Sequence, residues 1–456
     1  MVKYIAYILS LVVTTFVAVI SLEAQNSTSS PYSLYGVGVL TPQEDATSMA
    51  MGHSGIALAP NDWLDVANPA AVNNLDTLTF YFTAQMKLFY ARESTEHDHQ
   101  SVYSANVDGL AFGFRGTKWW GACIGYAPYS TVGYHMTDNE QYISGTNTKY
   151  SIRYTGSGGL SRAFFNNAFT LFDHLTLGIS AGAIWGSITK VETALFSQSI
   201  GGEDIYNTKK YTMNNWFIEY GMQFNFNIGE NNKFRFGAVY NRKTSLKSSY
   251  DHIVSNDVSN QLFFDDVTPL KADFTVPESY GAGISYQRKR FTVTCDAKYN
   301  KWGDLANSKF SETARFVDNW SIGGGAEWAF GNYNDIFIKR IKLRLGYAFE
   351  TSYLSLGGRN VDHYKTDVVT WKDKDGVVHT NNVTIPIMNE KNSELDSYAI
   401  TAGITIPMGR WSNAIVIGYE YRNHGTENMG MVKERFQNFK LAINIRETWF
   451  EKRKFE

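Results

Sequence analysis

Apolar and polar residues alternate over long stretches of this chain. In residues 77–90, every even position is apolar or aromatic: Leu78, Phe80, Phe82, Ala84, Met86, Leu88 and Tyr90. The same period of two recurs in residues 216–228, 291–300 and 341–350. Strands that face lipid on one side and a lumen on the other alternate over about 10 residues, longer than a typical soluble strand. The pattern therefore predicts strands that cross a membrane.

Counting such segments predicts about 14 strands, an even number as bacterial outer-membrane barrels require. They start near residues 77, 101, 118, 148, 174, 208, 232, 273, 290, 316, 337, 394, 412 and 433. Polar connections after odd-numbered strands are long, such as 92–100 and 244–270, whereas those after even-numbered strands are short, such as 116–117 and 287–290. We therefore expect an all-β fold, an antiparallel transmembrane β-barrel over residues 77–450. A soluble sandwich or propeller would not alternate long and short connections.

The two ends of the chain indicate export. Lys3 precedes an uncharged run over residues 5–22, and Ala24 follows, which predicts a secretory signal peptide over residues 1–24. The run could also span a bilayer, so an uncleaved anchor is the alternative. Export with cleavage, together with the predicted barrel, predicts a location in the outer membrane of a Gram-negative cell. At the other end, the aromatic pair 449–450 suits a membrane interface, and residues 451–456 form a charged periplasmic tail.

Residues 25–76 lack the alternation and form a separate segment before the barrel. Thr41-Pro42-Gln43-Glu44 matches a capping box, which predicts a short helix that Gly52 ends. Asn68-Pro69-Ala70 predicts a sharp break before the first strand. Because a barrel of about 14 strands would leave a channel unless something filled it, we expect residues 25–76 to fold inside as a hatch, or plug. A periplasmic extension outside the barrel is the alternative.

Composition supports the barrel and excludes several other classes. Of 456 residues, 15% are aromatic, only 19% are charged and only 9 are proline. A mean hydropathy of −0.28 excludes a polytopic helical membrane protein, which needs several long apolar runs. The formal net charge of −2 offers no basic face for nucleic acid. Two cysteines are too few for a disulfide framework.

Several motifs give the chain a family resemblance. Gly52-x-x-Gly55-x-Ala57, followed by Asn68-Pro69-Ala70, resembles the N-terminal hatch of the FadL-type long-chain fatty-acid transporters. Gly125-Tyr126-Ala127-Pro128-Tyr129 in the third strand is a further match, and the similarity covers nearly the whole mature chain. The resemblance implies a 14-stranded barrel, a hatch, and passage of hydrophobic solutes through a side opening at an inward kink of the third strand. Gly121, Gly125 and Pro128 are the expected site of that kink, since Gly and Pro weaken strand pairing.

Four apolar residues interrupt strand faces that should point to the lumen: Tyr81, Phe89, Ile184 and Phe217. A hydrophobic solute needs apolar lining with a few polar anchors, so these residues are candidates for ligand contact. Packing against the hatch is an equally good explanation.

The sequence contains no convincing catalytic, metal or cofactor motif. Gly52-His53-Ser54-Gly55 lacks the glycine that a nucleophile elbow needs, because Ile56 stands there. His97-Asp98-His99 has no clear third metal ligand. Asp373-x-Asp375-Gly376 lacks the first ligand of a calcium loop and predicts a hairpin turn instead.

The leading hypothesis is an outer-membrane channel for passive uptake of hydrophobic molecules, with long-chain fatty acids as the substrate that the resemblance implies. The alternative is a non-transporting barrel that acts as a structural or secretion-complex partner. A lipid hydrolase would need a Ser/His/acid set that the sequence does not offer. The expected partners are the bilayer, a hydrophobic ligand, the barrel-assembly machinery during biogenesis and a possible further protein, but not nucleic acid.

Overall fold

The computed structural model describes residues 29–448 except residue 139 and segments 143–148, 197–202, 257–261, 267–273, 306–313, 332–334, 357–363, 373–377, 387–394, 409–412 and 428–430. The predicted signal peptide, the aromatic pair 449–450, the tail 451–456 and the Asp373-x-Asp375-Gly376 turn lie outside the described residues.

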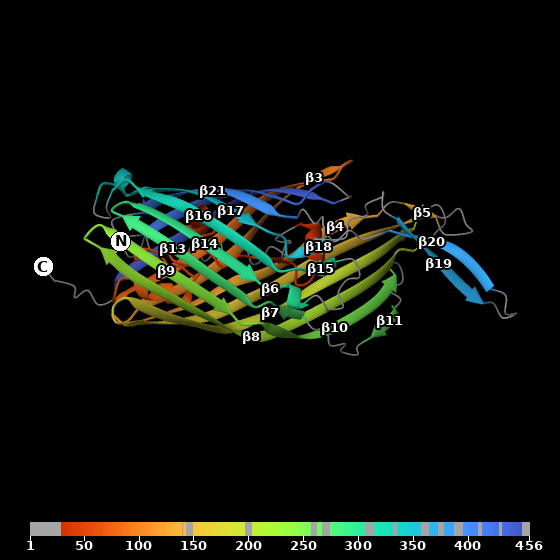
Figure 1. Cartoon of the computed structure of the whole chain (residues 1–456), viewed down its shortest axis with the longest axis horizontal. Coiled ribbons are helices and arrows are strands. Elements are labelled where there is room, and N and C mark those ends of the chain that lie inside the picture. The colour runs from red at the N-terminus through yellow and green to blue at the C-terminus, as the bar shows by residue number, and fades with distance from the viewer. Residues whose placement is uncertain are drawn as a thin grey trace.

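Fourteen antiparallel strands close into a barrel (Figure 1). They are β2 (Thr79–Ser94), β3 (His99–Arg115), β4 (Trp120–Thr137), β6 (Lys149–Leu171), β7 (Leu175–Phe196), β8 (Ile205–Ile228), β9 (Asn232–Asn241), β13 (Ser279–Arg288), β14 (Phe291–Asn300), β16 (Asn319–Ala329), β17 (Lys342–Glu350), β21 (Ser397–Met408), β22 (Asn413–His424) and β23 (Lys433–Thr448). The first and last strands, β2 and β23, pair from Thr79–Thr448 to Ser94–Lys433, which closes the barrel between its two ends. The predicted all-β transmembrane barrel is confirmed.

Shorter strands extend or accompany the barrel. β10 (Thr244–Asn256) follows β9 and pairs with β8, and β12 (Phe274–Val276) precedes β13 and pairs with β10. The remaining short elements are β5 (Gln141–Tyr142), β11 (Leu262–Asp266), β15 (Ala314–Phe316), β18 (Leu354–Leu356), β19 (Tyr364–Lys372), β20 (Val378–Pro386), η4 (Gly303–Leu305) and η5 (Phe337–Arg340). Among the described residues, no helix is both long enough and apolar enough to cross a bilayer.

Outward-facing aromatic residues mark where the barrel meets the membrane. Tyr220, Tyr240, Tyr280, Tyr299 and Trp320 face one another in successive strand pairs and form an outer belt. Phe226, Phe234 and Tyr286 form a second row nearer the short turns. The six residue steps from Tyr280 to Tyr286 span about 20 Å of strand. That distance is close to the apolar band of an outer-membrane barrel.

Two sequence predictions are wrong in detail. The expected long loop 92–100 is mostly strand, because β2 runs to Ser94, β3 starts at His99, and Thr95 N donates to Asp98 O at 2.8 Å across a tight turn. Much of 244–270 is also strand. Strand pairing continues beyond the aromatic belt, where both faces of a strand meet water. Strand residues there are polar, so a polar stretch in the sequence does not mark a loop.

The N-terminal segment, residues 29–78, lies inside the barrel against inward-facing residues of the wall. It comprises η1 (Pro31–Leu34), β1 (Val39–Leu40), α2 (Ala46–Ala50) and η2 (Pro69–Asn74). The predicted capping box is wrong: α2 starts later, because the Asp45 side chain accepts from Ser48 N at 2.8 Å and is the N-cap.

Glycines in the wall allow the N-terminal segment to approach the strands closely. A Cβ atom at Gly323 of β16 would overlap the carbonyl oxygen of Gly52, and one at Gly221 of β8 would overlap the Asn68 side chain. The backbone of the segment therefore rests directly on the strands, which explains glycines inside strands that otherwise favour larger side chains.

Candidate functional site

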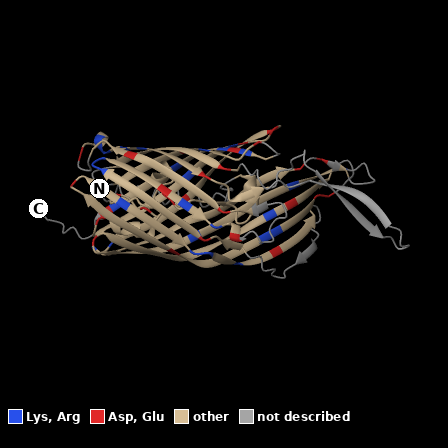
Figure 2. Cartoon of the chain, viewed as in Figure 1, with Lys and Arg blue, Asp and Glu red and all other residues tan. Residues whose placement is uncertain are grey.

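A cavity of about 390 Å³ lies between the N-terminal segment and the barrel wall. Part of its lining is apolar and comes from β1, β2, β4, β7 and β8: Leu40, Phe89, Tyr129, Ile184 and Phe217. Another part is charged and comes from the N-terminal segment, β3, β22 and β23: Glu44, His53, Asp108, Glu420, Arg422 and Lys440. Charged residues occur along the strands (Figure 2), and many of those that point inward are buried.

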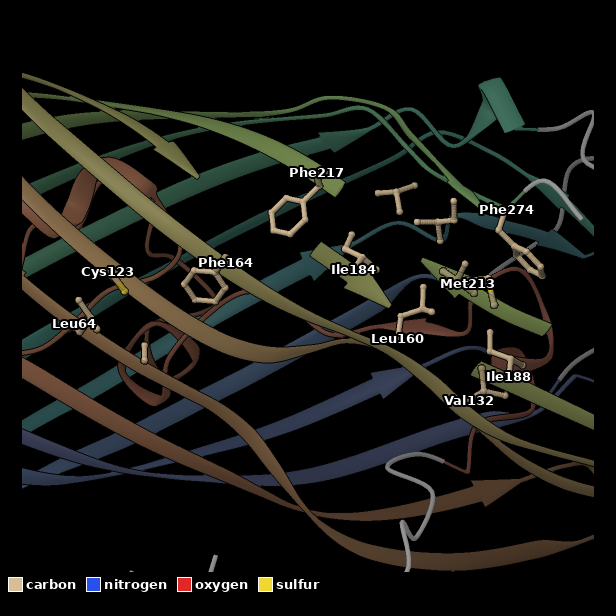
Figure 3. Close-up of a cluster of buried hydrophobic side chains, with 14 of the residues drawn as sticks. Leu64, Cys123, Val132, Leu160, Phe164, Ile184, Ile188, Met213, Phe217 and Phe274 are labelled. Carbon is tan, nitrogen blue, oxygen red and sulfur yellow. The ribbon is translucent and has the colours of Figure 1, made fainter. Parts of the chain in front are cut away.

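The four lumen candidates divide into two groups. Phe89, Ile184 and Phe217 line the cavity. Figure 3 shows Ile184 and Phe217 pointing into the same interior as Phe164. Tyr81 is not among the described lining residues, and its hydroxyl donates to Asn61 O at 2.5 Å, so it packs against the N-terminal segment. Their role in ligand contact remains a prediction.

Arg162 is a buried polar residue of this cavity that is not among the predicted site residues. Its side chain is 2% exposed, and its guanidinium lies 5.4 Å from the Phe164 ring centroid and 6.0 Å from that of Phe217. Arg162 Nη1 lies 3.3 Å from Glu219 Oε1. The signal was visible in the sequence, because this arginine lies on an inward face between Leu160 and Phe164.

A buried ion-pair cluster, called the latch below, joins the N-terminal segment to β22. It consists of Glu44, His53, Glu420 and Arg422. His53 Nδ1 lies 2.8 Å from Glu44 Oε2, and His53 Nε2 lies 3.0 Å from Glu420 Oε2. Arg422 Nε lies 2.7 Å from Glu420 Oε1. The imidazole therefore links two carboxylates, one on the segment and one on the wall.

The latch favours a charged His53. Burial disfavours the imidazolium, but the charges of Glu44 and Glu420 outweigh burial and raise the pKa of His53 to about 9. Burial likewise opposes ionisation of Glu44, but His53 and Lys440 lower its pKa to about 2. His53 and Glu44 are therefore both charged at neutral pH. His53 attracts Glu420 of the wall, and Glu44 attracts Lys440 of the wall.

Replacing His53 with Gln should cost stability in a pH-dependent way. The raised pKa of His53 means that its contribution is complete below about pH 6.5 and is lost as the pH rises through about 9. The contribution of Glu44 is complete above about pH 4.5 and is lost as the pH falls through about 2. Thermal unfolding from pH 6 to pH 10 should show the wild-type advantage over His53→Gln shrinking. The exposed His97→Gln variant is the control, and a constant difference would contradict the latch.

Lys440 of β23 forms a second buried link. Its Nζ lies 2.7 Å from Asp108 Oδ2 and 3.7 Å from Glu44 Oε1. The pairing of β2 with β3 shifts between Gln85 and Met86, so Asp108 is an extra residue in a β-bulge. The bulge lets the Asp108 carboxylate reach Lys440.

The boundary between β3 and β4, called the seam below, is incompletely paired. Registered pairs run only from Arg115–Gly121 to Leu110–Tyr126, six in all, although both strands continue toward the outer side. Beyond Tyr126, β4 pairs with β1 of the N-terminal segment at Ser130 and Thr131. The described strands therefore diverge at this position, and the cavity reaches it, since Asp108 and Tyr129 line the cavity.

The three kink candidates occupy different places in β4. Gly125 pairs with Ala111 next to the last seam pair, and a Cβ there would overlap the Phe164 ring. Pro128 adjoins the irregularity in the pairing of β4 with β6. Gly121 lies at the opposite end of the seam, paired with Arg115. Gly125 and Pro128 thus lie where the strands diverge, and Gly121 does not.

The predicted hatch motif residues are all bonded to, or packed against, their surroundings. Gly52 N donates to Thr401 Oγ1 at 3.0 Å, and Gly55 N donates to Asp296 Oδ2 at 2.7 Å. Asn68 Nδ2 donates to Ile56 O at 2.8 Å, and its Oδ1 accepts from Ala70 N at 3.0 Å. Pro69 and Ala70 pack against Gly221 and Gly178 of the wall. Within the described part of the chain, no group of three or more His, Cys, Asp or Glu residues is arranged to hold a metal ion.

Comparison with known proteins places the chain in a family. A family model described as BamG matches residues 1–368 and 379–456. The chain belongs to the BamG family. No curated protein has a matching sequence.

Solved structures share the fold. The Ralstonia pickettii toluene transporter TbuX is 15% identical, with a TM-score of 0.53, covering 89% of this chain and 98% of its own. The Pseudomonas putida toluene transporter TodX is 16% identical, with a TM-score of 0.53, and the match covers 91% of this chain and 100% of TodX. A Pseudomonas aeruginosa FadL homologue is 10% identical, with a TM-score of 0.54, and the match covers 91% of this chain and 100% of the homologue. This BamG-family chain therefore has the FadL-type fold that the sequence motifs indicated.

Proposed function

We propose that this protein is an outer-membrane channel for passive passage of hydrophobic molecules between its lumen cavity and the β3–β4 seam. The observation that carries the proposal is the end of strand pairing at Leu110–Tyr126, beside a cavity with apolar lining. Phe89, Ile184 and Phe217 would hold the apolar solute, and the N-terminal segment would act as the hatch. Structural neighbours named as toluene transporters support this function.

Association with the barrel-assembly machinery is the second candidate function. The family name BamG favours it. The latch and the Lys440 links also favour it, because they fasten the segment to the wall and oppose hatch movement. In that case the barrel would pass no solute and would serve as a protein partner.

A disulfide across the seam tests the proposed passage. A Cβ atom at Gly109 would lie 3.9 Å from Ala127 Cβ, close to the spacing of about 3.8 Å in disulfides. We expect the Gly109→Cys/Ala127→Cys variant, in a Cys123→Ala/Cys295→Ala background, to lose uptake of a fluorescent dodecanoic acid when oxidised. Dithiothreitol should restore uptake.

The matched control is a disulfide where the wall is already fully paired. Ala282 of β13 and Ala297 of β14 are directly paired. The Ala282→Cys/Ala297→Cys variant should take up the probe equally in both redox states. Undiminished uptake with a fully formed seam disulfide would contradict a passage that requires β3 and β4 to separate at Gly109 and Ala127.

A further inference from the structure

The outer half of β3 has one strand edge that no other described strand pairs with. On one side, β3 pairs with β2 from His99, opposite Ser94, to Gly109, opposite Gln85. On the other side, the registered pairs with β4 stop at Leu110, so residues 99–109 have no strand partner among the described residues. This edge presents a row of backbone N–H and C=O groups toward the seam.

Across the seam, backbone groups at the edge of β4 form hydrogen bonds with the N-terminal segment, which lies inside the barrel. β1 pairs with it at Ser130 and Thr131. Next to these pairs, Thr41 N donates to Tyr129 O at 2.9 Å. Farther out, Ser33 Oγ donates to Gly133 O, and Gly133 N donates to Ser33 Oγ, each at 3.1 Å. The N-terminal segment thus already completes one edge of the seam by strand addition, and no described part of it pairs with the β3 edge.

The β3 edge lies at membrane depth. Tyr103 is 82% exposed and pairs with Tyr90, another exposed aromatic. Outward side chains on this stretch are apolar, whereas inward ones are polar: Tyr103, Ala105 and Val107 against Ser104, Asn106 and Asp108. Backbone groups facing hydrocarbon without partners are strongly disfavoured. The bulge at Asp108 is where pairing with β4 ends, as expected of a strand feature that stops a ladder.

We propose that the free β3 edge, residues 103–109, pairs with a β-strand supplied by another outer-membrane protein. Only an extended polypeptide offers donors and acceptors at the spacing of the edge, and a hydrophobic solute or lipid tail offers neither. The added strand has apolar side chains toward lipid and polar ones toward the lumen, as β3 does. The inference goes beyond solute passage, because it concerns the edge of β3 and not the cavity. A strand bound at residues 103–109 would occupy the outer part of the seam, so it supports the assembly function and not passage at that position.

Site-specific photo-crosslinking in native membranes tests the proposal. p-Benzoylphenylalanine is placed at Tyr103, Ala105 or Val107, and at Ile284 as a control. Ile284 is 43% exposed, and its strand is paired on both sides. Replacing Tyr103 exchanges one exposed aromatic for another, which preserves folding. The cross-linked peptides are then sequenced by mass spectrometry.

Strand addition predicts adducts on one segment of one partner barrel. Moving the probe by two residues along β3 should move the attachment site by two residues along that segment. Lipid adducts alone, yields no higher than at Ile284, or attachment sites without the two-residue steps would overturn the proposal. Solute passage would be unaffected by such a failure, because the seam disulfide tests it separately.

Discussion

A Gly/Ser linker in place of residues 25–76 should turn the protein into an open pore. The N-terminal segment lies inside the barrel, and its backbone rests on wall glycines such as Gly221 and Gly323. A barrel of 14 strands without that segment is wide enough to admit water and ions. In planar bilayers, the linker variant should show large conductance steps that the intact protein does not show.

The control for this experiment replaces the turn 95–98 with a Gly/Ser linker of equal length, which leaves the lumen filled. Heat-modifiable migration on gels checks that each variant is a folded barrel. A folded linker variant with no increase in conductance would show that the N-terminal segment is not the plug.

Replacing Lys440 with Met should strongly destabilise the protein. Lys440 is 3% exposed, and its Nζ lies between the Asp108 and Glu44 carboxylates. Removing the cation leaves buried negative charge without its partner, which costs about 3–5 kcal/mol. Urea titration followed by tryptophan fluorescence should show a clearly lower midpoint.

The matched control is Lys209→Met, which removes an ion pair that water reaches. Lys209 Nζ lies 3.3 Å from Glu192 Oε1, with side chains 28% and 42% exposed. Such pairs contribute less than about 1 kcal/mol. Equal midpoint shifts for Lys440→Met and Lys209→Met would contradict the role given to the buried links.

The barrel could be predicted from sequence because alternation with a period of two directly records which face meets lipid. The first strand was expected near residue 77 and starts at Thr79, and the last was expected near 433 and starts at Lys433. The short helix was misplaced because Asp45 competes with Thr41 as the N-cap, and only the backbone conformation decides between them.

The latch and the seam were harder to foresee. The carboxylates and cations of the latch are far apart in sequence, as with His53 and Glu420, and no local pattern connects them. The alternation of residues along β3, by contrast, does indicate the position of the seam. Outward positions on β3 are odd at Tyr103, Ala105 and Val107 but even from Leu110 onward, and that change of phase marks the bulge at Asp108.

Native mass spectrometry of protein released gently from its own membrane tests the proposed channel most directly. A channel for hydrophobic molecules should carry a small apolar molecule in its lumen. That mass increment should be lost in Phe217→Gln, whose side chain lines the cavity, and retained in Ile179→Gln, whose side chain is 39% exposed on the outer face. An empty lumen together with a stoichiometric protein partner would contradict the channel and favour the assembly function.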